Sequence, residues 1–375
     1  MAVSPKKLIV VYGLLLAVAV GGWSAALIGA APRELWRKDL FTLGPPGTVV
    51  EPVATKTVTL AGVGDMVIGD GKSNMPPNGG REFFSKVTPL FDADLMMGNL
   101  EEPITDDTGF VKCDPAVPIP CHQFRVPPSY ARNLKDASFD LINVANNHDR
   151  DYGTQGQENT LKWLKSAGLM HTGAKGEITI ADVKGVKIAV LGFGFYKYQN
   201  TVLDLPAARA LVVKASAQAD IVAIQVHWGD EGADKAHVRP GPEYLRSEPR
   251  GDSIAFAHAV IDAGADIIFG HGPHTVRAME VYRGRLIAYS LGNFAGGGGL
   301  KGDGSLGWGG VLHATLTGEG NLLGGRFTST YFTSQPGQPL PDSRNRGLNL
   351  VRELTQADFP ATGARISVSG AISTL

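Results

Sequence analysis

Short apolar runs recur along the chain from residue 57 onward, and longer amphipathic stretches separate them. The runs are rich in β-branched residues and have the length of buried strands, whereas the stretches between them carry apolar residues at helical spacing. We predict strands at 57–63, 95–98, 141–145, 221–226 and 267–270, and helices at 129–137, 154–167, 207–218 and 253–263. This alternation of strands and helices predicts a layered α/β architecture.

Two further pairs of runs are predicted to form β-hairpins, because each pair flanks a short turn that contains glycine. The pairs are 178–183 with 186–191, around Lys184-Gly185, and 279–282 with 286–290, around Arg283-Gly284. Beyond Gly320 the sequence is expected to be rich in loops. We therefore predict a main domain at 56–330 and a C-terminal extension at 331–375 that packs on the domain or trails it.

A short polar cluster follows directly on each of the five predicted strands. The clusters are Gly64-Asp65, Gly98-Asn99-Leu100-Glu101, Asn146-Asn147-His148-Asp149, His227-Trp228-Gly229 and Gly270-His271-Gly272-Pro273-His274. In open α/β sheets, sites form in the loops beyond the carboxyl ends of the strands. The five clusters are therefore predicted to form one site, assembled from distant parts of the sequence.

The clusters contain the carboxylate, carboxamide and imidazole groups that borderline divalent metals prefer. The predicted metal ligands are Asp65, Glu101, Asn147, His227, His271 and His274. Glu102 is adjacent to Glu101, and the sequence does not decide between them. The alternatives are structural: Asp65 as a turn cap, and the histidines as surface or strand-end residues.

Other polar residues of the clusters are assigned to catalysis or to substrate. His148 is the candidate general acid or substrate contact, and Asp149 is expected to orient it. The predicted substrate-binding residues are Asn99, Asn146, Trp228 and Asn293. Three alternatives stay open: an asparagine-rich turn that satisfies backbone groups at 146–147, packing of Trp228 over the site, and a turn role for Asn293.

The N-terminus indicates export. Lys6 and Lys7 precede an uncharged stretch at 8–31, which is long for a cleavable signal and sufficient to span a bilayer. We predict a retained transmembrane helix in segment 1–31, with the positive end in the cytoplasm. Small residues at 29–31 leave cleavage and secretion as the alternative. Either way the domain lies outside the cytoplasm, connected through a Gly- and Pro-containing linker at 32–55.

Charge and cysteine content restrict the partners and the compartment. The chain of 375 residues has a formal net charge of −1, so no positive excess is available for binding nucleic acid. Cys113 and Cys121 are its only cysteines and flank a proline-rich loop. In an oxidising compartment they are expected to form a disulfide. A two-thiolate metal site is the alternative, but it lacks partners at fitting spacing.

These residues resemble the CapA family of poly-γ-glutamate capsule biosynthesis proteins. The matching segments, in the family's order, are Gly64-Asp65, 98–105, 140–148 with 151–153, 226–231, 261–266, 270–274 and 289–294. The family is similar to the calcineurin-like metallophosphoesterases, which implies a layered α/β sandwich of metallophosphatase type. This chain has Val67 where that pattern has a metal-binding His, and Asn99 where it has a bridging Asp. The resemblance therefore implies one firmly held metal ion, with a second left open.

The resemblance implies an extracytoplasmic, membrane-anchored protein that handles an anionic envelope polymer such as poly-γ-glutamate. Its chemistry would be hydrolysis or transfer assisted by Mn, Zn, Fe or Mg, and its partners would include polymer synthase or export subunits. Two alternatives remain: a non-catalytic scaffold of a polymer synthesis or export complex, and a secreted metallophosphoesterase.

Overall fold

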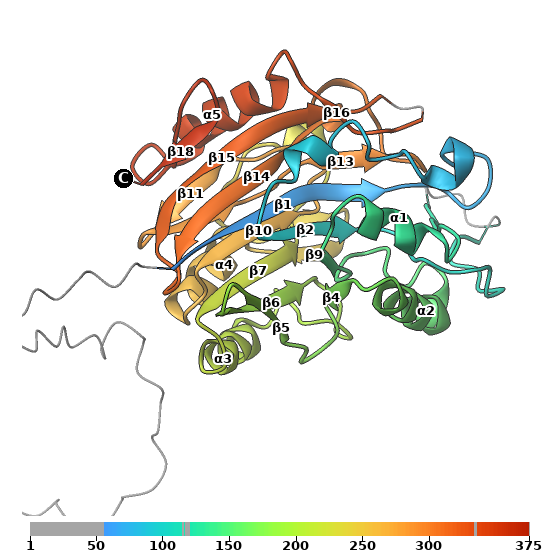
Figure 1. Ribbon diagram of the computed structural model, residues 1–375, viewed down its shortest axis with the longest axis horizontal. Helices are drawn as coiled ribbons and strands as arrows, with labels where there is room; N and C mark the ends of the chain where they lie inside the picture. Colours follow the sequence, from blue (N-terminus) through green and yellow to red (C-terminus); the bar gives the residue numbers. More distant parts are fainter. Residues whose placement is uncertain (1–55, 115, 117–120, 334–335, 375) are drawn as a thin grey trace, which may run out of the picture. The chain divides into compact units, whose positions relative to one another are not determined.

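Two β-sheets form the centre of the fold in the computed structural model, which describes residues 56–114, 116, 121–333 and 336–374. The larger sheet has ten strands in the order β17-β18-β15-β14-β1-β2-β3-β4, with β13 also beside β1 and β16 beside β15. Its strands are β1 (Thr57–Val67), β2 (Leu95–Leu100), β3 (Leu141–Asn143), β4 (Met170–Thr172), β13 (Asn293–Gly296), β14 (Trp308–Thr317), β15 (Leu322–Tyr331), β16 (Leu340–Pro341), β17 (Arg365–Ile366) and β18 (Ala371–Ser373). Figure 1 shows β1 between β14, its antiparallel neighbour, and β2, its parallel one.

The smaller sheet has six strands in the order β11-β12-β10-β7-β6-β5. They are β5 (Thr179–Val183), β6 (Val186–Phe193), β7 (Ile221–His227), β10 (Ile267–His271), β11 (Met279–Tyr282) and β12 (Arg285–Ala288). Strands β6, β7, β10 and β12 run parallel, and the two predicted hairpins are the antiparallel pairs β5–β6 and β11–β12. A separate hairpin consists of β8 (Glu243–Leu245) and β9 (Glu248–Gly251).

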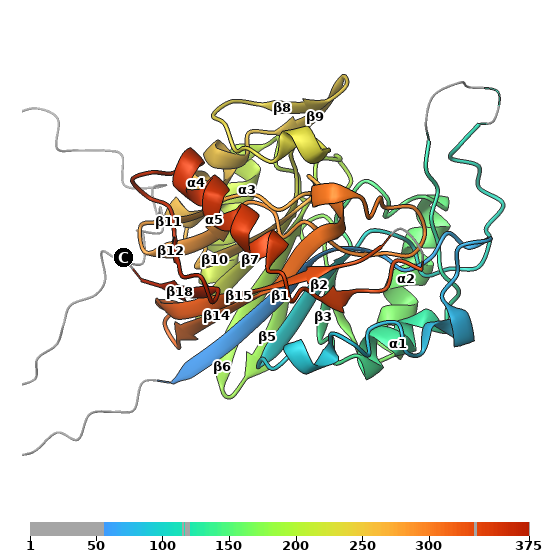
Figure 2. The ribbon, with the colours of Figure 1, turned by 90° about the horizontal axis from the view of Figure 1, so that it is seen from above.

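Helices cover the outer faces of both sheets, and the last of them also contributes to the core between the sheets. They are α1 (Tyr130–Asp136), α2 (Gly153–Ser166), α3 (Leu205–Ser216), α4 (Ser253–Asp262) and α5 (Arg346–Asp358), with short 3-10 turns at Pro77–Gly80, Thr88–Leu90, Ala233–Lys235 and Gly304–Gly307. Leu134 of α1 and Leu164 of α2 pack on the larger sheet, whereas Val212 of α3 and Phe256 of α4 pack on the smaller one. The two pairs of helices lie apart in both views (Figures 1 and 2).

The main core lies between the sheets. Leu60 and Met97 of the larger sheet pack there with Ala223 and Phe269 of the smaller one. Strands β2 and β7 are buried at every position, which is typical of parallel strands covered on both faces. Burial on both faces explains why these strands appear in the sequence as short, nearly continuous apolar runs. The layered α/β prediction is thereby confirmed.

The region beyond Gly320 differs from the prediction. It contains the long strand β15 and the helix α5, and Leu348 and Val351 of α5 belong to the core between the sheets. The prediction of a loop-rich tail was therefore wrong. Strand β15 combines two glycines, Gly324 and Gly325, with several polar residues, so its sequence lacks the apolar run on which the other strands were recognised.

The predicted anchor at 1–31 and linker at 32–55 lie outside the described residues. Within the part of the chain that the structure describes, no helix combines the length and apolar character needed to cross a membrane.

Candidate metal centre

The carboxyl ends of parallel strands from both sheets bring the predicted ligands together. In the larger sheet, neighbouring strands align Asn293, Asp65, Asn99 and Asn143 in one row across β13, β1, β2 and β3. In the smaller sheet, His227 at the end of β7 pairs with His271 at the end of β10. The first row faces the second, since Asp65 Oδ1 lies 3.8 Å from His227 Nδ1 and 3.7 Å from His271 Nδ1.

Glycines next to the ligands allow the backbones to approach closely. A Cβ on Gly64 would lie 1.8 Å from the carbonyl oxygen of Gly292, and one on Gly270 would lie 2.4 Å from that of Tyr289. The register of β1 shifts at Asp65, which marks a β-bulge of the kind that redirects a side chain. The sequence predicted that Asp65 follows the end of the strand. The strand instead continues to Val67, so Asp65 lies inside β1.

Asp65, Glu101 and His227 form a buried cluster, in which one ligand atom from each residue lies within 4.8 Å of the others. Glu101 Oε1 is 3.7 Å from His227 Nε2 and also 3.7 Å from His274 Nε2. His274 Nδ1 lies 3.3 Å from Asp65 Oδ2. Ligands that each lie about 2.1 Å from one metal ion are separated from each other by such distances.

Several polar atoms at this place are buried without a hydrogen-bond partner in the protein. They are Glu101 Oε1 and Oε2, His227 Nε2 and His271 Nδ1, and Asn147 Oδ1 in the neighbouring loop before His148 is a further one. Leaving a buried polar atom unpaired is costly, so a group of such atoms among predicted ligands indicates a missing partner. Oxygens and imidazole nitrogens all offer lone pairs to a cation. The residues therefore fit a divalent metal ion.

The hydrogen bonds of two histidines arrange their free nitrogens. His271 Nε2 lies 2.6 Å from Gln225 Oε1, which only accepts, so the Nδ1 atom of His271 keeps its lone pair toward Asp65. His274 Nδ1 donates to Asn293 Oδ1 at 2.8 Å, which leaves Nε2 facing Glu101. His274 has a positive φ of 60°, a conformation that is uncommon for non-glycine residues and that clusters at functional sites.

The ionisation of these groups follows from burial and from their mutual charges. Burial raises the pKa of Glu101 well above its ordinary value, and it lowers the pKa of His271 to about 4. Burial also opposes the charging of His274, but the neighbouring Glu101, Asp65 and Glu231 outweigh it and raise the pKa of His274 to about 10. In the metal-free protein these charges favour a proton on His274, and a bound cation would replace that proton.

Asn99 is a positioning residue and not a free substrate contact. Its Nδ2 atom donates to Asp65 Oδ1 at 2.7 Å and lies 3.3 Å from His227 Nδ1. Its Oδ1 atom accepts from Asn143 at 2.9 Å and from Asn146 at 3.2 Å. The side-chain amide of Asn99 is therefore engaged by other protein groups. This corrects the substrate-binding role expected for Asn99. The amide of Asn99 places an N–H donor between Asp65 and His227, where a second metal ion would need a bridging carboxylate. This favours one metal ion over two.

Three other residues expected to bind substrate are also internal. Asn146 is fully buried and donates to Asn99 and to the carbonyl of Leu100. Asn293 is 1% exposed and holds His274. Trp228 is 0% exposed and donates from Nε1 to the carbonyl of Tyr289, so it is a core residue. The structure thus corrects the assignment of these side chains to substrate.

The carboxylate that contacts His148 is Asp151, which corrects the expectation for Asp149. His148 Nδ1 lies 2.8 Å from Asp151 Oδ2, because a turn closed by Asp151 N and His148 O brings the two together. Asp149 instead accepts from Gln157, Tyr198 and Gln199. Burial raises the pKa of Asp149 to about 7.

The two adjacent glutamates have different surroundings. Both oxygens of Glu101 are unpaired and Oε1 lies near two histidines, whereas Glu102 accepts from Ile68 N at 2.5 Å and from Gly69 N at 3.3 Å. The choice that the sequence left open is therefore resolved in favour of Glu101 as the candidate ligand.

Two charged residues at the site were not predicted. Glu231 Oε2 lies 3.7 Å from His274 Nε2, and Glu231 Oε1 accepts from Arg250 at 2.8 Å. Glu231 belongs to the same resembling segment as His227, which is a signal that sequence analysis could have used. Arg250 comes from β9, and its position depends on the path of the β8–β9 hairpin. Cys113 and Cys121 form the expected disulfide.

Comparison with known proteins gives a family match over most of the described domain. The model of the family described as "Bacterial capsule synthesis protein PGA_cap" matches residues 59–297. The PGA biosynthesis protein CapA of Bacillus subtilis (strain 168) is 36% identical over 251 residues, covering 62% of this chain and 61% of the relative. The capsule biosynthesis protein CapA of Bacillus anthracis is 33% identical over 262 residues, covering 63% and 59%. The chain thus spans about three fifths of the length of these curated relatives.

A 5'-nucleotidase precursor from Thermus thermophilus is a solved structure with partial similarity. The similarity covers 80% of this chain and 59% of that one, with 12% identity and a TM-score of 0.41. This identity and TM-score are too low to assign the fold from that protein. The metallophosphatase type of the sandwich therefore stays a prediction.

Proposed function

The chain belongs to the bacterial capsule synthesis protein family PGA_cap, and from this premise we propose that it takes part in making or exporting an anionic envelope polymer such as poly-γ-glutamate. We further propose that it does so as a metal-dependent hydrolase or transferase. The single observation that carries the second part is the group of buried, unpaired lone-pair atoms on four predicted ligands from both sheets.

The proposed ligands are Asp65, Glu101, Asn147, His227, His271 and His274. Asp65 and Glu101 supply negative charge, and burial keeps His227 and His271 neutral and able to ligate, since it lowers the pKa of both rings. When bound, a divalent ion supplies Lewis-acid polarisation of the scissile carbonyl oxygen. This ligand set restricts the metal to a divalent ion such as Mn, Zn, Fe or Mg.

His148 is proposed as the general acid that protonates the leaving group. Its Nδ1 atom is held by Asp151, which leaves Nε2 for the substrate, and 11% of its side chain is exposed. A proton-transfer group needs both a fixed ring and access to the reacting atoms. Asp151 acts through His148 as a positioning residue.

We also propose that the domain works outside the cytoplasm, tethered by a transmembrane helix in segment 1–31. The disulfide between Cys113 and Cys121 supports this location, because disulfides persist in oxidising compartments.

The test uses the purified full-length protein in detergent, with poly-γ-glutamate as substrate. We expect cleavage or transfer by the metal-loaded protein, and loss of both bound metal and activity after chelation or in His271→Ala. His237→Ala is the matched control, because His237 lies half exposed beside Asp358, outside the candidate metal centre. Activity that is indifferent to chelation and to His271→Ala would contradict the catalytic proposal.

One observation favours a scaffold role as the second candidate. Asn99 places an amide between Asp65 and His227, where the related pattern has a bridging carboxylate. In that case the ion is structural or bridges polymer carboxylates. Polymer assembly in producing cells that survives His148→Ala but not removal of residues 1–31 would favour the scaffold.

A further inference from the structure

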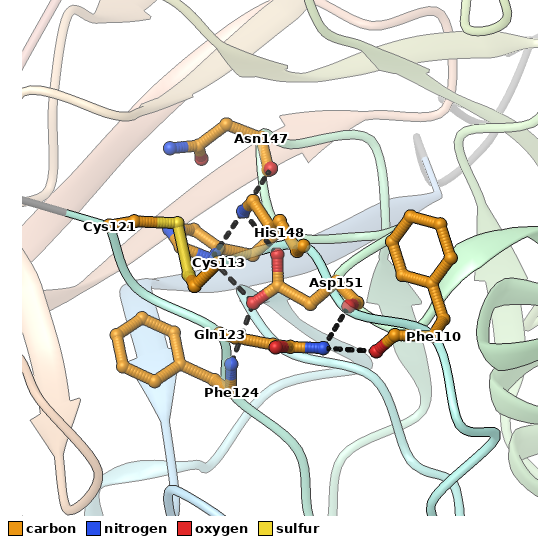
Figure 3. Close-up of a disulfide and its surroundings, with 9 residues drawn as sticks. Phe110, Cys113, Cys121, Gln123, Phe124, Asn147, His148 and Asp151 are labelled. Atoms are coloured by element: carbon orange, nitrogen blue, oxygen red, sulfur yellow. Dashed lines mark hydrogen bonds and ion pairs between the residues drawn. A yellow bond between two sulfur atoms is a disulfide. The ribbon is translucent and has the colours of Figure 1, made fainter. Parts of the chain in front are cut away.

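A disulfide-closed segment lies against the candidate acid. We call residues 110–113 and 121–124, joined by the Cys113–Cys121 bond, the strap. Figure 3 shows the carboxylate of Asp151 between His148 and the strap residue Phe124. The ring of Phe124 also packs on that of His148, with 4.7 Å between the centroids.

Both limbs of the strap are bonded to the buried residue Asp151. On one limb, Phe124 N donates to Asp151 Oδ2 at 2.7 Å, and Gln123 Nε2 donates to the Asp151 carbonyl at 2.7 Å. On the other limb, Lys112 Nζ pairs with Asp151 Oδ1. Gln123 also reaches the carbonyl of Phe110 at 2.9 Å and so joins the limbs a second time.

These bonds place the ammonium group of Lys112 beside the candidate acid. Lys112 Nζ lies 3.5 Å from His148 Nδ1 and 3.4 Å from the carbonyl oxygen of Asn147. His148 Nδ1 faces Asp151, so it offers no lone pair to Lys112. An ammonium has three donors, and Asp151 and Asn147 use two of them. Since 31% of the side chain is exposed, a third donor remains for a ligand that approaches from the solvent side.

The charges around the site indicate what that ligand is. In the metal-loaded protein the carboxylates of Asp65 and Glu101 would offset the charge of the ion, and Glu231 is paired with Arg250, so a polycarboxylate gains from a further cation beside the site. Arg250 cannot serve, because it is 1% exposed and ion-paired with Glu231 and Glu248. Lys112 is exposed and fixed at the edge of the site, and a charged donor binds a carboxylate strongly.

We propose that Lys112 is a specificity-determining residue that binds a carboxylate of the polymer next to His148, and that the strap holds it there. This inference rests on the proposed function and adds the residue by which the site recognises the carboxylates of the polymer. Closing the strap at Cys113, one residue from Lys112, restricts where the ammonium can go.

The experiment measures binding of two probes to the metal-loaded, full-length protein. One probe is a γ-linked glutamate oligomer, and the other is the same oligomer with its α-carboxylates converted to carboxamides. We expect the wild-type protein to prefer the acid. Lys112→Gln should reduce that preference about tenfold, the size of effect that loss of one charge-assisted bond produces, whereas Lys112→Arg should retain most of it.

Two controls separate recognition from general effects. Lys214→Gln removes the same charge from the exposed face of α3 and should leave the preference unchanged. Reducing the disulfide should weaken binding of the acid probe in the wild-type protein and have much less effect in Lys112→Gln, since the strap acts through Lys112. Melting temperatures check that each variant is folded.

An unchanged acid preference in folded Lys112→Gln would overturn this inference and leave the proposed function standing. Failure of the wild-type protein to bind either probe would overturn both. A preference that falls equally in Lys214→Gln would also count against Lys112, because it would reflect net charge and not a fixed contact.

Discussion

Adjacent residues at the end of β2 have opposite roles. Glu101 is buried with both oxygens unpaired, whereas Glu102 is buried with its oxygens bonded to the backbone N–H groups of Ile68 and Gly69. The first arrangement leaves a carboxylate ready for a cation, and the second uses one to hold the chain after β1. A single substitution at each position should therefore separate metal binding from stability.

We predict that Glu101→Gln weakens metal binding at least about tenfold, in the range found when a single partner of a metal site is removed. Elemental analysis and metal titration check this. Because Glu101 has no hydrogen-bond partner to lose and burial disfavours its charged form, the melting temperature of the metal-free protein should not fall.

Glu102→Gln is the matched comparison. It should keep the metal but lower the free energy of unfolding by about 1–3 kcal/mol, because a Gln amide nitrogen cannot accept from Ile68 or Gly69. Denaturant unfolding of the metal-free protein measures this. If Glu102→Gln lost the ion and Glu101→Gln kept it, the assignment of the ligand would be reversed.

A second residue-scale prediction concerns Asp151. Asp151→Asn replaces the acceptor of His148 Nδ1 with an amide that can donate to it, which disfavours the ring orientation and tautomer that catalysis needs. We expect kcat for polymer cleavage to fall at least about 100-fold. Asp149→Asn should change kcat far less, since Asp149 bonds Gln157, Tyr198 and Gln199. Equal losses in both variants would show that His148 depends on the whole loop.

At the scale of elements, α5 and β15 contribute to the central core although they follow the matched family region. Leu348 of α5 is 2% exposed in the core between the sheets, whereas Leu323 of β15 is 51% exposed. Asp342 fixes the start of α5 by accepting from Arg346 N and from Ser329 Oγ. The C-terminal region is therefore part of the described fold.

We predict that Leu348→Ala destabilises the protein by about 2–5 kcal/mol, the usual cost of truncating a buried leucine. The control Leu323→Ala should stay within about 0.5 kcal/mol of the wild-type protein. Unfolding by denaturant in the absence of metal gives both values. A small effect of Leu348→Ala would mean that the helix is only loosely attached to the sheets.

At the scale of the whole molecule, the candidate centre joins the two sheets. Asp65 and Glu101 come from the larger sheet and the loop after it, and His227 and His271 come from the smaller one. An ion held by both sets stabilises the packing of one sheet on the other, so metal binding and sheet packing are thermodynamically linked.

Much of this arrangement was predictable from the sequence, because the central strands carry their own signal. The apolar run that ends at His227 is buried throughout as β7, and the polar residue that follows such a run falls at the sheet edge where ligands meet. The strand β15 has no such run, so its identity depends on pairing with β14.

The contacts of individual side chains were less predictable. Asp149 and Asp151 both lie close to His148 in sequence, and only the turn that follows His148 decides which carboxylate reaches its ring. Arg250 reaches Glu231 only through the β8–β9 hairpin. Lys112 reaches Asn147 only because the strap is anchored on Asp151. Each contact is set by tertiary structure, and local sequence patterns do not encode it.

The close backbone contacts of Gly64 and Gly270 constrain how this sequence can evolve. A side chain at either position would collide with a carbonyl oxygen whether or not an ion is bound, whereas Asp65 and His271 chiefly serve the proposed ion, since their partners Asn99 and Gln225 lie in the same site. Descendants that abandon the chemistry should therefore lose the aspartate and the histidine first and keep both glycines. Sequences that retain the glycines alone would mark relatives that keep the fold without the candidate metal centre.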